Sequence, residues 1–257
     1  MENKKVALIT GAGAGIGKAI TFKLAEDGYQ IAVNSRTEAH ANEVYKVLSK
    51  NKVNCISVPA DVSDENQVKL MVKKVYEKFG RIDILINNAG ICPIRTMDKV
   101  TVKDIQETFN VNVISMMLCV QAVLPIMIKQ GGGKILNASS QASFGETPVS
   151  FEYTTTKWAV RGMTREMAIS LARYNITVNA YCPGVVYTNM QDNITKETSK
   201  IMNVTEDYFK EYRLKQIPLN RFTTCEDVAE LVSFMAGKGS NNMTGQSILV
   251  NGGQIMV

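Results

Sequence analysis

The chain has 257 residues, of which 45% are hydrophobic and 21% are charged, and its formal net charge is +5. These values are typical of a globular protein, and the length suits a single α/β domain over residues 1–257. The positive charge is spread along the chain without a basic block, so the sequence does not indicate a nucleic-acid partner.

The sequence also lacks the usual signs of export and membrane insertion. No apolar run approaches the ~20 residues that span a membrane. Residues 1–5 lead directly into a strand-like segment, without the features of a signal peptide. The five cysteines are odd in number and are not spaced as metal ligands: Cys55, Cys92, Cys119, Cys182 and Cys225. We therefore expect a cytoplasmic protein with reduced cysteines, no bound metal and no membrane partner.

Short apolar segments alternate with helical patterns along the whole chain. The apolar segments predict strands at 5–10, 31–33, 53–58, 82–86, 134–138, 176–182 and 246–250. The helical patterns predict helices at 16–27, 38–50, 63–79, 102–129 (where an interruption is left open), 151–173 and 226–236. Residues 188–216 are expected to be polar and irregular with helical patches. This alternation predicts the α/β class, with one Rossmann-type, doubly wound parallel sheet that has helices on both faces.

A glycine-rich loop joins the first predicted strand to the first predicted helix. Residues 11–17 contain four glycines in seven positions, more than a simple tight turn needs. Glycines let the backbone approach a pyrophosphate closely, and the start of the following helix attracts negative charge. The loop therefore predicts a dinucleotide site, and its expected contacts are Gly11, Ala14, Gly15, Ile16 and Gly17.

The end of the second predicted strand bears on the choice of cofactor. An acidic residue there binds the ribose of NAD, whereas an arginine accommodates the 2′-phosphate of NADP. This chain has Ser35 and Arg36 and no carboxylate before Glu38. The pattern favours NADP(H), although Ala14 offers no second cation and NAD(H) stays open.

Two residues beyond the third predicted strand are also expected to contact the cofactor, Asp61 and Val62. Asp61 could accept a hydrogen bond from the adenine amino group. Its alternative role is that of a turn or helix-capping residue.

Tyr153 and Lys157 lie four residues apart in a predicted helix, so their side chains share one face. A phenol titrates near pH ~10, and a neighbouring ammonium should lower that pKa into a range useful for proton transfer. Ser140, thirteen residues upstream, could offer a hydroxyl to the same reacting oxygen. The spacing alone also suits a packed tyrosine and a solvated lysine without a catalytic role. Motifs elsewhere in the chain are needed to distinguish the two.

These motifs occur together in one order: the glycine loop, Asn87-Asn88-Ala89-Gly90, Asn112, Ser140, Tyr153, Lys157 and Pro183-Gly184. In this combination the chain resembles the short-chain dehydrogenase/reductase family from Lys4 to Gly253. The resemblance implies that 87–90 stabilise the central sheet beside the cofactor. It also implies cofactor contacts at Asn88, Ala89, Gly90, Tyr153, Lys157, Pro183, Gly184, Val186 and Thr188, of which Thr188 holds the carboxamide.

The same resemblance implies four catalytic residues. Asn112 would hold a water that relays protons to Lys157, and Ser140 would orient the substrate carbonyl. Tyr153 would transfer the proton, and Lys157 would also bind the nicotinamide ribose. Asn110 and Ser139 are the neighbouring competitors for the roles of Asn112 and Ser140. The resemblance further implies a homotetramer with 102–129 and 151–173 at one interface.

A narrower resemblance points to the acetoin (diacetyl) reductase and 2,3-butanediol dehydrogenase branch. It is carried by 133–142 and 179–188, and by parts of 153–162 and 243–247. That branch commonly has an aspartate where Ser35 stands, and Asn251 replaces the usual aspartate before Gly252. The branch implies a small hydroxyketone, diketone or polyol as substrate, which would suit the polar Gln141.

Substrate selection is expected at Ser140, Gln141 and Tyr153 and in the region around them. Other candidates are Cys92, Ile94, Ser143, Phe144 and a lid at 188–216. Within this lid, Met202, Tyr208, Phe209 and Tyr212 either line an apolar pocket or pack the lid onto the body. An aromatic pocket would favour bulkier 3-oxoacyl or hydroxysteroid ketones. A catalytically silent dinucleotide-binding protein is the remaining alternative, although such a protein would be expected to lose Tyr153 or Lys157.

Overall fold

The computed structural model describes residues 4–145 and 149–257. Residues 1–3, with which the expected domain begins, and 146–148, between Ser140 and Tyr153, lie outside the described residues.

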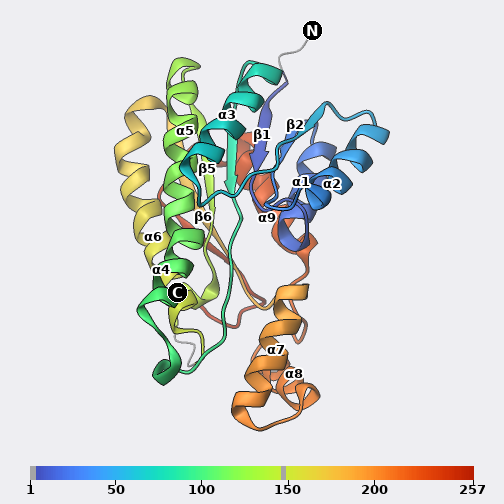
Figure 1. The fold of residues 1–257 in the computed structure, drawn as a ribbon, viewed down its shortest axis with the longest axis vertical. Helices are drawn as coiled ribbons and strands as arrows, with labels where there is room; N and C mark the ends of the chain where they lie inside the picture. The colour runs from blue at the N-terminus through green and yellow to red at the C-terminus, as the bar shows by residue number, and fades with distance from the viewer. Residues whose placement is uncertain (1–3, 146–148) are drawn as a thin grey trace.

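A seven-stranded sheet forms the centre of the molecule, and all of its pairings are parallel (Figure 1). Its strands lie in the order β3-β2-β1-β4-β5-β6-β7. Their bounds are β1 Val6–Ile9, β2 Gln30–Val33, β3 Cys55–Ser57, β4 Ile84–Asn87, β5 Gly133–Ala138, β6 Ile176–Pro183 and β7 Ser247–Val250. The predicted fold class is confirmed. The strand order reverses between β1 and β4, and such a reversal opens a crevice at the carboxyl ends of the strands.

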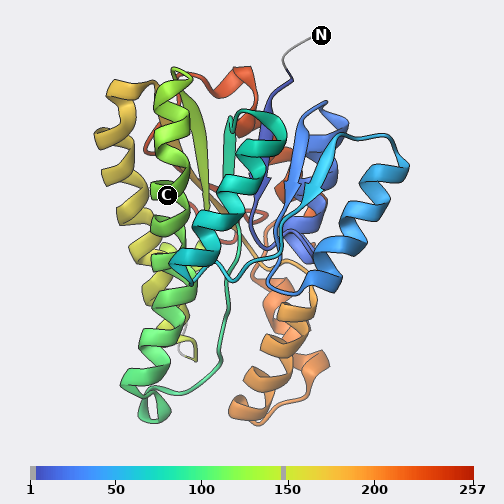
Figure 2. The same ribbon diagram turned by 45° about the horizontal axis from the view of Figure 1, so that its top comes forward.

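Helices cover both faces of this sheet (Figures 1 and 2). Alternate strand residues point to opposite faces. Ala7 and Ile9 join an apolar cluster with α1, α2 and α9, whereas Val6 and Leu8 join one with α3, α5 and α6. The bounds are α1 Gly15–Glu26, α2 Glu38–Lys50, α3 Glu65–Phe79, α4 Val102–Phe109, α5 Ser115–Lys129, α6 Phe151–Leu171, α7 Asn189–Met202, α8 Glu206–Lys215 and α9 Cys225–Ala236.

The long predicted helix at 102–129 is interrupted by a π-helical turn, Asn110–Ile114, between α4 and α5. Such turns occur frequently at functional sites. Taken as one helix, Val102–Lys129 is long and apolar enough to cross a membrane, so the expectation that no segment qualifies was wrong. In this fold α5 contacts α3, β4 and β5, which is the packing of a core helix.

Residues 188–216 are more regular than expected, because they form the two helices α7 and α8. Thr188 and Thr205 cap them by accepting hydrogen bonds from the main-chain N–H groups of Gln191 and Tyr208. Each cap satisfies a main-chain donor that the first turn of its helix leaves without a partner within the helix. Figure 1 shows the helix pair extending from the carboxyl edge of the sheet.

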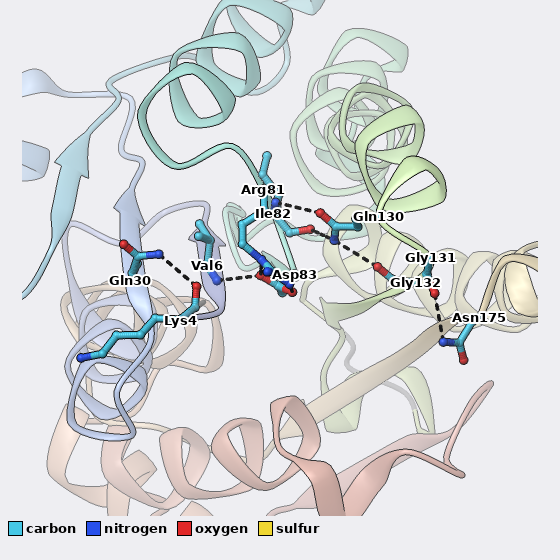
Figure 3. A network of polar contacts seen from close by, with 10 residues as sticks. All are labelled: Lys4, Val6, Gln30, Arg81, Ile82, Asp83, Gln130, Gly131, Gly132 and Asn175. Carbon is cyan, nitrogen blue, oxygen red and sulfur yellow. Dashed lines mark hydrogen bonds and ion pairs between the residues drawn. The ribbon is translucent and has the colours of Figure 1, made fainter. Parts of the chain in front are cut away.

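A polar network braces the opposite, amino edge of the sheet (Figure 3). One carboxylate oxygen of Asp83 accepts from the N–H of Val6 at 2.8 Å and from Nε of Arg81 at 2.8 Å. Nε2 of Gln130 donates to the carbonyls of Ile82 at 2.6 Å and Gly132 at 3.0 Å. These bonds fix the starts of β1 and β4, whose far ends border the crevice.

Candidate active site

The glycine loop packs closely against the start of α1 and the end of β4. Gly11 has a φ of +63°, and a Cβ placed on it would lie 2.9 Å from Cα of Ala89. A Cβ on Gly17 would lie only 2.2 Å from the carbonyl oxygen of Gly11. Among the described residues, no side chain makes a capping hydrogen bond at the start of α1, and its first turn holds no acidic residue. Its free N–H groups therefore suit an anionic pyrophosphate, so the loop fits the predicted dinucleotide.

Asn88 joins this loop to two strands. Its Nδ2 donates to the carbonyls of Thr10 and Gly11, both at 3.2 Å, and its Oδ1 accepts from the hydroxyl of Tyr181 at 3.1 Å. The hydroxyl of Thr10 in turn accepts from the N–H groups of Asn88 and Ala89, at 2.9 and 3.1 Å. This bonding is consistent with the stabilising role that the resemblance implies for 87–90.

At the far end of the expected cofactor site, Ser35 is buried and Arg36 is exposed. A Cβ on Gly13 would lie 2.9 Å from Oγ of Ser35, so this hydroxyl borders the glycine loop. Within the described residues, Arg36 makes no ion pair with a carboxylate. Its guanidinium is therefore available to an external phosphate.

Asp61 lies beyond the carboxyl end of β3, and Thr188 lies beyond that of β6. Oδ1 of Asp61 accepts from the N–H and the hydroxyl of Ser63, at 2.9 and 2.6 Å, which is the turn role considered from the sequence. Contact of Asp61 with adenine stays a prediction, as does contact of the neighbouring Val62, which is buried. Across the crevice, a Cβ on Gly15 would lie 3.1 Å from the methyl group of Thr188, so this residue faces the glycine loop.

Ser140, Tyr153 and Lys157 come together at the carboxyl end of β5. Helix α6 places Nζ of Lys157 5.3 Å from the centroid of the Tyr153 ring, and the same Nζ donates to the carbonyl of Ala138 at 2.8 Å. Ser140 and Tyr153 line one cavity, and Oγ of Ser140 accepts from the N–H of Ala142 at 3.1 Å. Ser139 instead donates to the main-chain carbonyl of Lys157 at 3.0 Å, so it braces α6.

Burial dominates the titration of the tyrosine and lysine pair. Burial raises the pKa of Tyr153, and hydrogen bonding with Ser140 lowers it by a smaller amount. Burial lowers the pKa of Lys157 to about 8. The expectation that the Tyr153 pKa is lowered is therefore wrong, because desolvation by burial is the largest contribution and raises it.

Asn112 is fully buried in the π-helical turn, whereas Asn110 is exposed. Oδ1 of Asn112 accepts from the N–H of Ile91 at 2.8 Å, and Nδ2 donates to the carbonyl of Ile91 at 2.9 Å and to the Thr156 hydroxyl at 3.0 Å. A Cβ on Gly90 would lie 3.2 Å from Oδ1 of Asn112 and 3.8 Å from Nζ of Lys157. The absence of a side chain at Gly90 thus keeps space between these two polar groups.

A cavity of about 470 Å³ opens beside the serine and tyrosine. Six residues named from the sequence line it: Cys92, Ile94, Gln141, Met202, Phe209 and Tyr212. Three others point elsewhere. Ser143 donates to the carbonyl of Ser140 at 2.7 Å, the Phe144 ring lies 3.7 Å from the Arg161 guanidinium, and Tyr208 is exposed.

The cavity wall also contains Arg213 and Gln216, which fall within the expected lid without having been named for a role, and Gln254 and Ile255, which no sequence prediction covered. Phe209, Tyr212, Arg213 and Gln216 follow the spacing of one helix face, a signal that could have identified Arg213. No comparable pattern marks the C-terminal residues. Gln254 reaches the cavity after β7 and accepts from Nε2 of Gln141 at 2.9 Å.

Comparison with known proteins gives matches along nearly the whole chain. The family model described as short chain dehydrogenase matches residues 5–199. An L-2,3-butanediol dehydrogenase of Corynebacterium glutamicum is 42% identical over 255 residues, covering 98% of both chains. A diacetyl reductase, (S)-acetoin forming, of Staphylococcus aureus is 39% identical over 254 residues, again 98% of both. A 3-oxoacyl-(acyl-carrier-protein) reductase of Staphylococcus aureus is 36% identical over 257 residues, covering all of both.

Solved structures give the same picture of the fold. An actinorhodin polyketide ketoreductase with NADPH has a TM-score of 0.94 and 29% identity, covering 99% of this chain and 98% of that one. A gluconate 5-dehydrogenase of Burkholderia cenocepacia, in complex with NADP and tartrate, has a TM-score of 0.89 and 31% identity. That match covers 97% of this chain and 94% of the other.

Proposed function

The chain belongs to the short-chain dehydrogenase family, as its sequence predicted, and we propose that it interconverts a secondary alcohol and a ketone by hydride transfer with NADP(H). Family membership makes it an oxidoreductase that acts on CH–OH groups with a nicotinamide dinucleotide. The observation that supports the reaction best is the position of Ser140 and Tyr153 on one wall of the cavity, with Lys157 behind the tyrosine.

The bound nicotinamide would supply or accept the hydride, and the side chains would manage the charge on the carbonyl oxygen. Oγ of Ser140 accepts from the N–H of Ala142, and its O–H, which lies within hydrogen-bonding reach of the Tyr153 phenol, would donate to that oxygen. Tyr153 would donate the proton during reduction and accept it during oxidation. Two donors placed at the developing alkoxide stabilise it more than the ground state.

Lys157 and Asn112 would support this proton transfer from behind. Lys157 uses one of its three N–H donors on Ala138, which leaves two for the nicotinamide ribose and for the neighbourhood of Tyr153. A water in the space beside Gly90 would contact both Lys157 and Asn112. Such a water would return protons to the buried pair, as the resemblance implies.

NADP(H) is proposed as the preferred cofactor because of Ser35 and Arg36. An exposed arginine without a carboxylate partner among the described residues suits a 2′-phosphate. Two similar structures contain NADPH or NADP. NAD(H) is the alternative, because the glycine loop supplies no second cation.

For the substrate we propose a small hydroxyketone, diketone or polyol. The named activities of the butanediol dehydrogenase and the diacetyl reductase support this class. So does Gln141, whose Oε1 is buried without a hydrogen-bond partner among the described residues and can accept from a substrate hydroxyl. The alternative is a bulkier ketone, favoured by Phe209 and Tyr212 in the cavity wall and by the 3-oxoacyl reductase relative.

We also propose that 1–257 form one domain in which 188–216 act as the substrate lid, because α7 and α8 contribute several cavity residues. A cytoplasmic homotetramer is proposed from the resemblance. Exposed apolar side chains on its expected interface helices support it, among them Val102 on α4 and Trp158 and Ile169 on α6. A monomeric mass in solution would contradict the tetramer.

The first test is the initial rate of NADPH and NADH oxidation against diacetyl, acetoin, ketose sugars, β-ketoesters and ketosteroids. Fastest turnover of small vicinal carbonyls is expected, and a preference for ketosteroids or β-ketoesters would move the proposal to the bulky-ketone alternative. The Tyr153→Phe variant should bind NADPH and lose about 10²- to 10⁴-fold in kcat. Substantial turnover by this variant would exclude Tyr153 as the proton donor.

A further inference from the structure

Arg213 is a partly buried cation in the cavity wall that the hydride-transfer reaction does not use. It lies in α8, and its Nε is buried without a hydrogen-bond partner among the described residues. The guanidinium carbon lies 5.7 Å from the centroid of the Phe209 ring, which holds the side chain against the wall. The cavity therefore contains an arginine whose Nε has no hydrogen-bond partner among the residues that the structure describes.

The described residues around Arg213 supply no negative charge to match it. In the described part of the chain, no Asp or Glu lines the cavity and no carboxylate forms an ion pair with Arg213. Glu211 on the same helix instead pairs with the exposed Lys215 at 2.7 Å. Burying a cation without a partner is unfavourable, so the fold retains a cost that a bound anion would relieve.

This cation and the reacting groups line the same cavity. Ser140 and Tyr153 come from the end of β5 and from α6, whereas Arg213 comes from the lid. Cys92 lines the same cavity, and both Arg213 and Lys157 act to lower its pKa, although burial dominates and raises it to about 12. One small molecule in this cavity can thus meet both the serine–tyrosine wall and the arginine.

We propose that Arg213 binds an anionic group, a carboxylate or a phosphate, carried by the substrate at the end opposite its reacting carbonyl. This inference rests on the proposed function and specifies its substrate class as a hydroxyketone with an anionic terminus. The planar guanidinium can donate two parallel hydrogen bonds to either group.

A purely structural role for Arg213 is the competing explanation. Its position in the last turn of α8 favours a cation, and its contact with Phe209 could serve lid packing alone. A structural role would affect charged and neutral substrates alike. If Arg213 binds an anion, its substitution changes the ratio of kcat/KM between charged and neutral substrates.

The experiment compares kcat/KM for two pairs of hydroxyketones with a saturating nicotinamide cofactor. Dihydroxyacetone phosphate against dihydroxyacetone tests a phosphate, and 5-keto-D-gluconate against D-fructose tests a carboxylate. The wild type should favour the charged member of at least one pair. Arg213→Gln should lower that charged-to-neutral ratio by about 10- to 100-fold, which corresponds to one lost charge-assisted hydrogen bond. The control Lys215→Gln removes a charge from the exposed side of α8 and should leave the ratio unchanged.

A second measurement does not depend on turnover. With NADPH bound at saturation, inorganic phosphate or tartrate should raise the thermal midpoint of the wild type and not that of Arg213→Gln. The anion proposal is overturned if the charged-to-neutral ratio of kcat/KM is near one in the wild type, or if Arg213→Gln has the same ratio as the wild type. Turnover of the neutral substrates would still support the proposed function in that case. If no small hydroxyketone reacts, the proposed function fails, and the midpoint shifts alone decide whether Arg213 binds anions.

Discussion

Replacing Lys157 by methionine is expected to stabilise the ligand-free protein while abolishing its activity. Lys157 is 4% exposed, and burial lowers its pKa from 10.5 to about 8. Keeping this buried ammonium charged at neutral pH therefore lowers the free energy of unfolding by about 3 kcal/mol. Loss of the hydrogen bond to Ala138 offsets about 1 kcal/mol. The net gain of about 2 kcal/mol should raise the thermal midpoint by about 4–8 °C.

The dependence on pH identifies the cause of this effect. Between pH 8 and 10.5 the folded protein loses the Lys157 proton before the unfolded chain does. The unfolded state then binds more protons, so the stability of the wild type rises with pH. Lys157→Met has no ammonium at this position to deprotonate, so its stability does not rise for this reason. The amount by which it is more stable than the wild type should therefore shrink between pH 7 and pH 10. Lys134, whose pKa burial also lowers to about 8, contributes equally to both proteins.

The assay is chemical or thermal unfolding without cofactor at both pH values. Lys69→Met provides the control, because Lys69 is exposed on α3 and its ion pair with Glu65 is also exposed. That variant should differ from the wild type by no more than about 0.5 kcal/mol at either pH. A Lys157→Met variant that is less stable than the wild type at pH 7, or that exceeds the wild-type stability by the same amount at pH 7 and pH 10, would show that burial of the ammonium does not destabilise the fold.

Two further predictions concern the cofactor site. Arg36→Ala should lower kcat/KM for NADPH by about 10- to 100-fold relative to NADH in the same rate assay, and an unchanged cofactor preference would show that Arg36 does not bind the 2′-phosphate. Gly17→Ala should weaken NADPH binding in a fluorescence titration and cost about 1–3 kcal/mol in urea unfolding, because its Cβ would lie 2.2 Å from the Gly11 carbonyl oxygen. Gly162→Ala is the control, because a Cβ at Gly162 would have nothing within 4 Å. It should keep the NADPH affinity and the stability of the wild type, and equal losses in the two variants would contradict the role of close packing at Gly17.

The sequence predicted the strands and most helices because their signals are local. An apolar run marks each strand, and Gly80, with a φ of +72°, ends α3 at the predicted place. The lid at 188–216 was harder to predict because its helices bury few apolar residues. Their caps, Thr188 and Thr205, were present in the sequence, but a cap indicates a helix only together with the residues that follow it.

The sequence by itself determined the α/β class, the family, the place of the glycine loop and the order of Ser140, Tyr153 and Lys157. These features depend on residue type and spacing along the chain. Only the tertiary structure decided how burial shifts the Tyr153 and Lys157 pKa values, and that Arg213 and the C-terminal Gln254 reach the same cavity as Gln141. Desolvation and missing charge partners depend on the atoms that surround a group, and long-range packing brings those atoms from segments that are distant in the chain.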